Sequence, residues 1–388
     1  MGADEIFDFI VVGGGCIGTS TVHALITERP GAKIAWFTGK HKRTASNDFI
    51  KIIRDVYPDD VVSEFANRAL QKWMSTSPYR EYFHKTAWIR AICSDDENRM
   101  TRRSSDDVLT ASEMMEAVGS DAAPLLDESE ELFLNPNVGY ADSARAVESI
   151  ADDAVKLGVR RHKINVTRLI VEDGKCLGVQ VEGSIVKGAN QIIVSAGAWT
   201  PSLLAQSGIA FPPDFFTATA IAVATVALSD QEFTNLKSMP ILATEKAIGE
   251  IMLSHRERVL KINYATSFRI SDPDQLSDAV DVTGNRELLE KMLPQFKGRD
   301  LESFICPDLL TPYQYPIIDR MPDVRHLIIA TGGSYHSYKL LPVIGEIVAL
   351  RIRNHQGRDS IESALLNRCR WERMQGTKSI HARLVPQS

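Results

Sequence analysis

A glycine-rich turn close to the start of this 388-residue chain restricts its fold more than any other feature. Residues 7–12 are mostly apolar and predict a short buried strand, and residues 13–18 read Gly-Gly-Gly-Cys-Ile-Gly. A helix is expected over 19–28 and a second strand over 33–37, because a Pro-Gly pair separates the two segments. This order of strand, glycine turn, helix and strand is typical of the βαβ unit of a Rossmann-type α/β fold.

Three glycines of the turn occupy the positions of the dinucleotide-binding pattern. Gly13 permits the tight turn, Gly15 lets the backbone approach a pyrophosphate, and Gly18 lets the helix pack closely on the strand. The N-terminus of the helix would then offer free N–H donors and a positive dipole end to phosphates. We therefore expect a nucleotide site here, with a purely structural turn as the alternative.

The ribose contact of this pattern is missing. An acidic residue usually stands about 20 positions after the turn, and this chain has Thr38 at the end of the second strand. A threonine hydroxyl can still bind a sugar hydroxyl, so we expect this contact to be weaker or replaced.

Apolar periodicity predicts the remaining elements. Helices are expected over 62–74 and 143–157, strands over 87–93, 166–171, 176–182, 184–187, 191–195, 217–228 and 259–268, and a charged loop over 95–107. Near the C-terminus a strand (326–330), a glycine-containing loop (331–337) and a helix (341–353) repeat the N-terminal order. This repetition predicts a nucleotide domain that the chain leaves and re-enters, with a substrate domain formed by the middle segments.

The composition argues against several classes of function. The net charge is −6 and the Lys and Arg residues are scattered, so we expect no nucleic-acid partner. No run of about 18 apolar residues occurs, so we expect no membrane span. The histidines lack metal-ligand spacing, so we expect no metal. Five dispersed cysteines, an odd number, indicate reduced thiols and a cytoplasmic protein.

Four further stretches follow the glycine turn. They are Ser-Asn-Asp-Phe-Ile-Lys-Ile-Ile-Arg at 46–54, Ser-Ala-Gly-Ala-Trp at 195–199, Cys-Pro-Asp-Leu-Leu-Thr-Pro at 306–312 and Gly-Gly-Ser-Tyr-His-Ser-Tyr-Lys at 332–339. Together with the turn, they resemble the D-amino-acid-oxidase superfamily, and within it the branch of monomeric sarcosine oxidases and fructosyl amino acid oxidases (amadoriases). The resemblance runs nearly end to end and is thin between the motifs.

The resemblance implies a flavoenzyme with two domains. A Rossmann-type FAD-binding domain would comprise 1–81, 138–206 and 313–388, and an α+β substrate domain on a mostly antiparallel sheet would comprise 82–137 and 207–312. Enzymes of this branch carry FAD on a cysteine thioether and oxidise secondary amines to imines. They pass the electrons to O2, which gives hydrogen peroxide. We expect a monomer that acts on a small amine or amino acid.

Cys306 matches the flavin-bearing cysteine of the branch, because four residues and then Thr-Pro follow it. Without the resemblance, a buried core thiol is the simpler interpretation of this cysteine. Asp308 is a residue that fructosyl amino acid oxidases tend to have where sarcosine oxidases have an aromatic side chain.

Four cations match positions of the catalytic site. Arg54 and Lys339 stand where the resembling enzymes hold the substrate carboxylate, which needs such a partner when it is buried. Lys51 matches the fructosyl amino acid oxidase pattern and would lie in the pocket near the flavin. Lys261 matches the lysine whose charge stabilises the reduction of O2. Surface salt bridges for Arg54 and Lys339, and a solvent-facing strand position for Lys261, are the alternatives.

The resemblance places FAD against residues from every motif. They are Gly13, Gly15, Cys16, Ile17, Gly18, Thr38, Ser46, Val166, Ala196, Gly197, Trp199, Cys306, Gly333, Tyr335, His336 and Lys339.

Substitutions near the expected flavin separate this chain from the sarcosine oxidases. Asn47 and Ala265 stand where those enzymes have histidines, and Tyr335 and Ser337 replace glycines that flank His336. Tyr335 would narrow the space beside the ring and could project into the cavity. His336 either takes part in proton transfer or fixes the loop backbone. We therefore expect a substrate other than sarcosine itself.

These observations predict an FAD-dependent amine oxidase that acts on a secondary amine or an N-substituted amino acid. A fructosyl, N-methyl or saccharopine-like amino acid, or a biosynthetic intermediate, fits this prediction. Two alternatives stay open: a flavin-dependent dehydrogenase that does not use O2, and a non-catalytic FAD-binding protein. The altered loop around Tyr335 and the missing acidic residue at Thr38 favour the second alternative.

Overall fold

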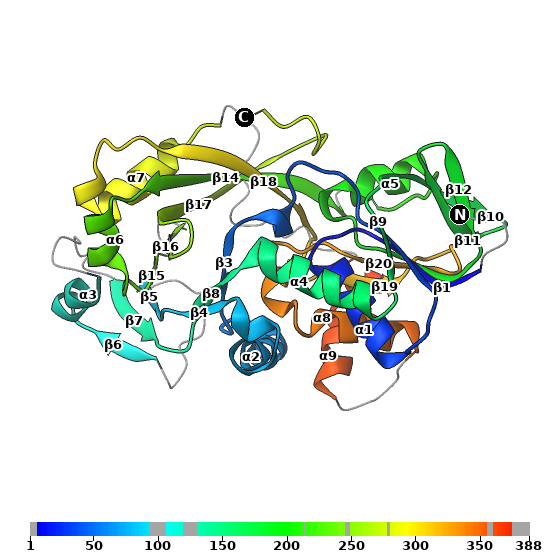
Figure 1. Ribbon diagram of the computed structural model, residues 1–388, viewed down its shortest axis with the longest axis horizontal. Helices are drawn as coiled ribbons and strands as arrows, with labels where there is room; N and C mark the ends of the chain where they lie inside the picture. Colours follow the sequence, from blue (N-terminus) through cyan, green and yellow to red (C-terminus); the bar gives the residue numbers. More distant parts are fainter. Residues whose placement is uncertain are drawn as a thin grey trace.

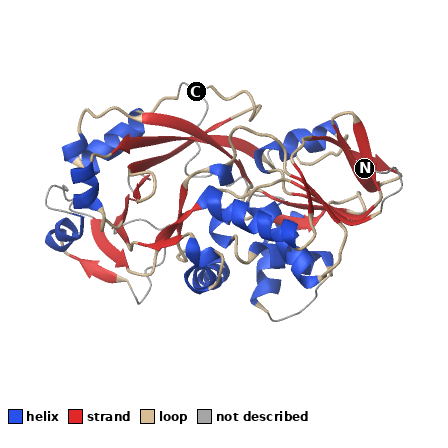
Figure 2. Cartoon of the chain, viewed as in Figure 1, coloured by secondary structure: helices blue, strands red, loops and turns tan. Residues whose placement is uncertain are grey.

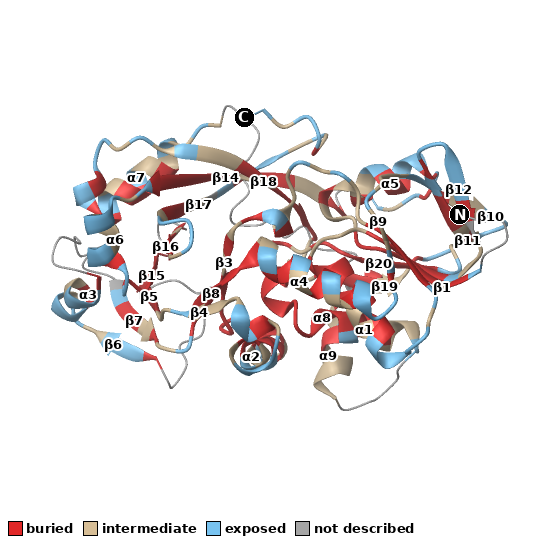
Figure 3. Cartoon of the chain, viewed as in Figure 1, coloured by how far each residue is buried: buried red, intermediate tan, exposed pale blue. Residues whose placement is uncertain are grey.

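Two large β-sheets lie side by side in the computed structural model, each with helices packed against it (Figure 1 and Figure 2). The structure describes residues 6–93, 106–118, 130–212, 215–244, 249–277, 280–354 and 360–374. The charged loop expected over 95–107 therefore lies mostly outside the described residues. Buried residues lie along both sheets and on the helices packed against them (Figure 3).

The first sheet is the parallel sheet that the glycine turn predicts. Its order is β19-β20-β13-β1-β2-β9, and only β19 runs antiparallel to its neighbour. The strands are β1 (Phe7–Val12), β2 (Ile34–Phe37), β9 (Arg160–His162), β13 (Ala189–Val194), β19 (Ile317–Arg320) and β20 (Leu327–Thr331). Because β20 pairs with β13 and β13 pairs with β1, the C-terminal strand returns to the sheet that carries the N-terminal turn.

Successive residues of these strands face two different layers, as period-two alternation requires. Val11, Trp36 and Ile193 pack against a helical layer, whereas Ile10 and Val194 pack against the opposite layer. The helices of the first layer are α1 (Cys16–Glu28), α2 (Asp60–Ser75), α4 (Ser143–Lys156), α8 (Ile344–Ile352) and α9 (Ile361–Arg368). The opposite layer contains β10 (Val166–Glu172), β11 (Lys175–Val181), β12 (Ser184–Lys187) and α5 (Thr200–Gln206).

The second sheet has eight strands in the order β18-β14-β17-β16-β15-β5-β7-β6. All its pairs are antiparallel except β15 with β5. The strands are β5 (Trp88–Cys93), β6 (Asp107–Leu109), β7 (Glu130–Asn135), β14 (Thr217–Ala227), β15 (Ile241–Thr244), β16 (Gly249–Ser254), β17 (Val259–Arg269) and β18 (Glu302–Leu310). The predicted fold class, a Rossmann-type sheet beside an α+β region on a mostly antiparallel sheet, is confirmed.

One face of the eight-stranded sheet is covered by its own helices. Leu260 and Ile262 of β17 pack there with Leu288 and Leu289. The helices of this region are α3 (Ala111–Val118), α6 (Asp230–Leu236) and α7 (Thr283–Met292). The opposite face is therefore left to line a cavity between the two sheets.

A small sheet of β3 (Ile50–Ile53), β8 (Gly139–Asp142) and β4 (Phe83–Lys85) lies between the two large ones (Figure 1). No strand is expected over β3 from the sequence, since Lys51 interrupts its short apolar run. Short 3-10 turns complete the fold: η1 (Ala45–Asn47), η2 (Tyr79–Glu81), η3 (Gly197–Trp199), η4 (Pro294–Phe296), η5 (Ser337–Leu340) and η6 (Trp371–Met374).

The two glycine-associated helices begin at other residues than expected. Helix α1 begins at Cys16, inside the glycine turn, and α8 begins at Ile344 after the turn η5.

The domain boundaries inferred from the sequence stay a prediction. Within the described residues, no helix combines the length and the apolar character that crossing a membrane requires.

Helices α1 and α8 make a backbone contact that depends on Gly345. A Cβ at this position would lie 2.0 Å from the carbonyl oxygen of Ser20. The Gly345 N–H also donates to the Ser20 hydroxyl at 2.9 Å, and this hydroxyl donates to the Leu341 carbonyl at 2.7 Å.

We expect Gly345→Ala to destabilise the protein by about 1–3 kcal/mol, since the two helices must separate to accept the methyl group. Urea unfolding monitored by circular dichroism measures this loss. Glu346→Ala is the matched control, because Glu346 is exposed on the same helix and its one ion pair among the described residues is with Lys72 at the surface. It should cost about 0–1 kcal/mol, and an equal loss in both variants would contradict the close-contact explanation.

Candidate active site

Two adjoining cavities lie where the predicted site residues gather. A groove of about 720 Å³ runs along the glycine turn, and a cavity of about 420 Å³ lies between β3 and the eight-stranded sheet. Ala45, Ser46 and Asp308 line both. An extended ligand can therefore pass from the groove into the cavity.

The glycine turn has the close contacts that only glycine tolerates. Gly13 has a φ of +119°, and a Cβ there would lie 2.1 Å from the Ser195 carbonyl oxygen. A Cβ on Gly18 would lie 2.1 Å from the Gly13 carbonyl oxygen, so this glycine allows the helix to fold back on the turn. The Cys16 N–H donates to the Ser46 hydroxyl at 2.9 Å.

The predicted cofactor residues divide between these cavities. The groove is lined by Gly13, Gly15, Thr38, Ser46, Val166, Ala196, Gly197 and Trp199. The cavity is lined by Cys16, Ser46, Cys306, Gly333, Tyr335, His336 and Lys339. Ile17 and Gly18 line neither cavity: Ile17 belongs to the hydrophobic core beside α1. Whether the lining residues contact FAD stays a prediction.

The open end of the groove carries an aromatic pair. The rings of His41 and Trp199 lie 4.0 Å apart between centroids, and both side chains hydrogen-bond to the Asp274 carboxylate at 3.0 and 2.9 Å. Thr38 donates its backbone N–H to the His162 carbonyl at 2.9 Å and lines the groove.

Strand register explains which side chains form the cavity floor. Cys306 of β18 pairs with Ile221 of β14, and Lys261 and Asn263 of β17 pair with other β14 residues on the same face. Lys261 is only 1% exposed. The solvent-facing alternative for Lys261 is therefore wrong.

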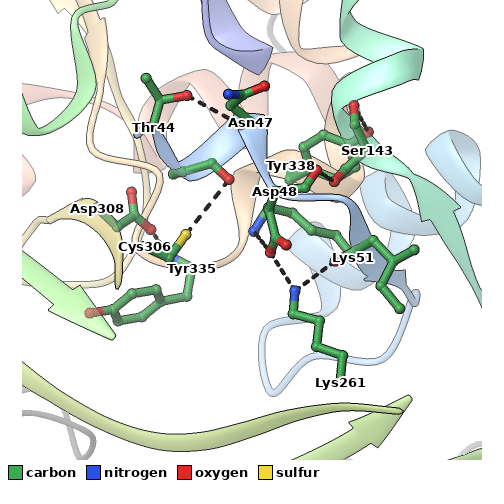
Figure 4. Close-up of polar contacts among 12 residues, drawn as sticks. Thr44, Asn47, Asp48, Lys51, Ser143, Lys261, Cys306, Asp308, Tyr335 and Tyr338 are labelled. Atoms are coloured by element: carbon green, nitrogen blue, oxygen red, sulfur yellow. Dashed lines mark hydrogen bonds and ion pairs between the residues drawn. The ribbon is translucent and has the colours of Figure 1, made fainter. Parts of the chain in front are cut away.

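One carboxylate joins the two lysines of the cavity (Figure 4). Asp48 accepts hydrogen bonds from the ammonium groups of Lys261 and, at 3.0 Å, of Lys51. Lys261 also donates to the Ile50 carbonyl at 2.7 Å. Asp48 is 4% and Lys261 is 1% exposed, whereas the Lys51 side chain is 22% exposed. The three charges therefore form a largely buried cluster with both signs present.

Burial and neighbouring charge set the ionisation of this cluster. Burial would raise the pKa of Asp48, but the two lysines outweigh it and hold that pKa below its ordinary value. Burial lowers the pKa of Lys261, and the charge of Asp48 opposes this change without cancelling it. Burial also lowers the pKa of Lys51, but the charge of Asp48 outweighs burial and raises that pKa above its ordinary value.

Arg54 lies against aromatic rings on the opposite wall of the cavity. Its guanidinium carbon is 4.4 Å from the ring centroid of Tyr57 and 5.4 Å from that of Trp88, and it donates to the Val56 carbonyl. Arg54 is 5% exposed and Lys339 is 6% exposed. The surface salt-bridge alternative is therefore wrong for both residues.

The loop with the substituted glycines is tied to the sheet. Tyr335, at a φ of +65°, donates its backbone N–H to Asp308 at 2.7 Å. Its hydroxyl lies 2.7 Å from the Thr219 hydroxyl of β14. Tyr335 thus lines the cavity with its ring fixed between two strands (Figure 4). The His336 ring contacts the Gln314 side chain at 3.4 Å.

Cys306 and Asp308 occupy the same face of β18. The Cys306 thiol lies 3.9 Å from the Ala45 carbonyl oxygen and faces the cavity. Burial raises the pKa of Cys306, and the nearby Lys51 and Lys261 partly oppose it. Burial also raises the pKa of Asp308, against hydrogen bonds from the Leu309 and Tyr335 N–H groups.

Sequence analysis assigns no role to several polar residues of this cavity. Asp48 stands within a quoted motif, and Arg90, Glu250 and Asn263 line the cavity from β5, β16 and β17. The only signal in the sequence is that each of these polar residues stands beside an apolar stretch. This pattern does not show which face of the strand is turned inward, so it does not identify them as cavity residues.

Comparisons with known proteins agree with the motifs. The family model described as FAD dependent oxidoreductase (DAO) matches residues 8–351. The chain is 23% identical to L-saccharopine oxidase of Schizosaccharomyces pombe over 88% of this chain and 89% of that protein. It is 24% identical to a monomeric sarcosine oxidase of a Bacillus species over 93% of this chain and 97% of that protein. The fold matches fructosamine oxidase (amadoriase II) of Aspergillus fumigatus with a TM-score of 0.81, at 19% identity, over 96% and 90% of the chains.

Removal of the shared carboxylate should leave two buried ammonium groups side by side. We expect Asp48→Asn to destabilise the protein by about 3–5 kcal/mol, as for a broken buried ion pair. Thermal and urea unfolding measure this loss. Because the folded-state pKa of Asp48 is lowered, the stabilisation is present above the ordinary carboxyl pKa and is lost as the pH falls through the folded-state value.

The double variant Asp48→Asn/Lys261→Met distinguishes charge balance from packing. It restores the cluster to one net positive charge, so it should unfold at higher urea concentration than Asp48→Asn alone. A double variant that is less stable than the single one would contradict the charge argument.

Proposed function

The chain belongs to the family of FAD-dependent oxidoreductases, and we propose that it uses FAD to oxidise the carbon–nitrogen bond of a secondary amine or N-substituted amino acid. The observation that carries this proposal is the single cavity that brings Lys51, Lys261, Arg54 and Lys339 together with Cys306. The names of two relatives support it, since they state the oxidation of saccharopine and of sarcosine, which are N-substituted amino acids.

The residues present fit FAD as the cofactor. Gly13 and Gly15 line a groove at the start of α1, where a helix N-terminus favours a pyrophosphate. The groove meets the cavity at Ser46 and Asp308, so a molecule with a nucleotide at one end and a ring system at the other has one continuous path. These residues would hold FAD with its reactive ring in the cavity.

When bound, FAD would supply the two-electron acceptor for a substrate that loses two electrons and two protons on going from amine to imine, and O2 would take up both electrons and two protons as hydrogen peroxide. Arg54 and Lys339 would hold the substrate carboxylate in a buried setting, where an ion pair is stronger than in water. The same positive charge disfavours the ammonium form of the substrate, so its nitrogen enters the reaction with a free lone pair.

Lys261 and Lys51 would supply the charge that favours O2 reduction. With all three groups ionised, Asp48 neutralises one of the two lysines, and the cluster keeps one net positive charge at the cavity wall. A fixed positive charge in a buried site stabilises the anion that forms when O2 accepts an electron. We assign this role mainly to Lys261, which lies on the cavity floor.

A substrate panel tests the proposed function. We expect an N-methyl, fructosyl or saccharopine-like amino acid to bleach the yellow absorption of the bound cofactor without oxygen, and to release hydrogen peroxide with oxygen. Bleaching without peroxide, together with reduction of an artificial dye, would indicate a dehydrogenase. Absence of bleaching across the panel would contradict the proposal and favour a non-catalytic FAD-binding protein.

Lys261→Met separates the reduction of the cofactor by substrate from its reoxidation by O2 in the same assay. We expect the oxygen reaction of the reduced protein to slow by about 10²–10³-fold, measured by stopped-flow absorption. Anaerobic bleaching by substrate should change far less, because the carboxylate partners Arg54 and Lys339 stay in place. Equal losses in both half-reactions would argue against the assigned role.

We further propose that Cys306 carries FAD as a thioether. After acid precipitation, the wild-type pellet should stay yellow, and Cys306→Ser should release the colour into the supernatant. Cys16→Ser is the matched control, because the Cys16 thiol lines the same cavity and should leave the colour in the pellet. Colour in the wild-type supernatant would contradict covalent attachment.

A further inference from the structure

A row of side chains crosses the cavity floor in register. Asn263 of β17 pairs with Glu250 of β16, Glu250 pairs with Ala243 of β15, and Ala243 pairs with Arg90 of β5. All four residues line the cavity. Neighbouring strands lie about 4.8 Å apart, so Glu250 stands about 14 Å from the strand of Cys306, three strands away.

Glu250 and Asn263 present two hydrogen-bond acceptors to the cavity. The Oδ1 atom of Asn263 is buried and has no hydrogen-bond partner among the described residues. Within the same described part of the chain, the half-buried Glu250 carboxylate makes no hydrogen bond or ion pair. Because an unpaired acceptor away from water costs free energy, the buried Asn263 oxygen suits a donor that the described residues do not supply. The half-buried Glu250 carboxylate on the paired strand faces the same cavity.

The other acids of the cavity wall already have partners. Asp48 binds Lys51 and Lys261, and Asp308 accepts from the Leu309 and Tyr335 N–H groups. The Arg90 guanidinium of the floor row pairs with Asp106 at 2.5 Å. Lys261, which lies diagonal to Glu250 on the neighbouring strand β17, binds Asp48. Glu250 therefore carries a charge that a ligand can neutralise.

We propose that Glu250 and Asn263 form a subsite for a cationic group of the substrate, either a protonated amine or a guanidinium. This inference rests on the proposed function and names its substrate class as a basic N-substituted amino acid. The substrate carboxylate cannot occupy this place, because Glu250 would repel it. A cation fits better than a neutral hydroxyl group, because only a cation both donates hydrogen bonds and neutralises the carboxylate.

Three probes with one reacting centre test the subsite. Nα-methyl-lysine, Nα-methyl-norleucine and Nα-methyl-2-aminoadipate share the secondary amine and the carboxylate, and end in an ammonium, a methyl and a carboxylate group. The FAD-loaded full-length protein is mixed with each probe without oxygen, and the dissociation constant is taken from how the bleaching rate depends on probe concentration, or from the absorption shift on binding for a probe that does not bleach the cofactor. We expect the lysine probe to bind about tenfold more tightly than the norleucine probe, with the aminoadipate probe weakest.

Variants at and away from the subsite decide the outcome. In Glu250→Gln, the ratio of the norleucine to the lysine dissociation constant should fall to near one. Glu302→Gln removes an exposed carboxylate on β18 of the same sheet and should leave this ratio unchanged. Asn263→Asp adds a second negative charge and should increase the preference, which provides a test that does not depend on Glu250→Gln folding well. A wild type without preference, or a Glu250→Gln protein that keeps it, would overturn the subsite.

The same titration separates this inference from the proposed function. Preferential binding of the lysine probe without bleaching would uphold the subsite and contradict the oxidation. Equal bleaching by all three probes in both the wild type and Glu250→Gln would uphold the oxidation and overturn the subsite.

Discussion

Two lysines can lie in the wall of one cavity because a single carboxylate lies between them. Asp48 accepts from Lys51 and Lys261, and its backbone carbonyl accepts from the Ser143 hydroxyl and the Ala144 N–H at the start of α4. The residue thus connects β17 of the eight-stranded sheet to the helical layer of the parallel sheet. Burying an ammonium group without an acidic partner is costly, so the placement of these two lysines in the cavity wall depends on this one acid.

The features that could be predicted from the sequence are those with a local cause. Gly13 lies against the Ser195 carbonyl, and Gly18 lies against the Gly13 carbonyl within the same turn. The spacing of these glycines is therefore set locally, by the geometry of the turn. The parallel sheet follows from that turn and from the strand that returns before the C-terminal glycine loop. Lys51 and Lys261 also lie in the cavity where the family resemblance places them, but alternation along β17 alone leaves two faces equally available to Lys261.

The features that could not be predicted depend on contacts between distant segments. Asp48 and Lys261 are 213 positions apart, and no local pattern relates them. Glu250 and Asn263 are paired across a hairpin, yet their role depends on which face of the sheet the helices cover. Tyr335 was expected beside the ring, and the structure adds that its hydroxyl meets Thr219 of β14. Sequence periodicity gives the elements of the parallel sheet and only some strands of the second sheet, whereas three-dimensional register decides which polar side chains meet.

The wall that the groove and the cavity share has a consequence for how this protein could diverge or be redesigned. Asp308 borders both spaces and also fixes the backbone of Tyr335. Changes there would alter cofactor retention and substrate choice together. The floor strands β16 and β15 contribute residues to the cavity alone, so they offer positions where selectivity could be retuned while nucleotide affinity is conserved.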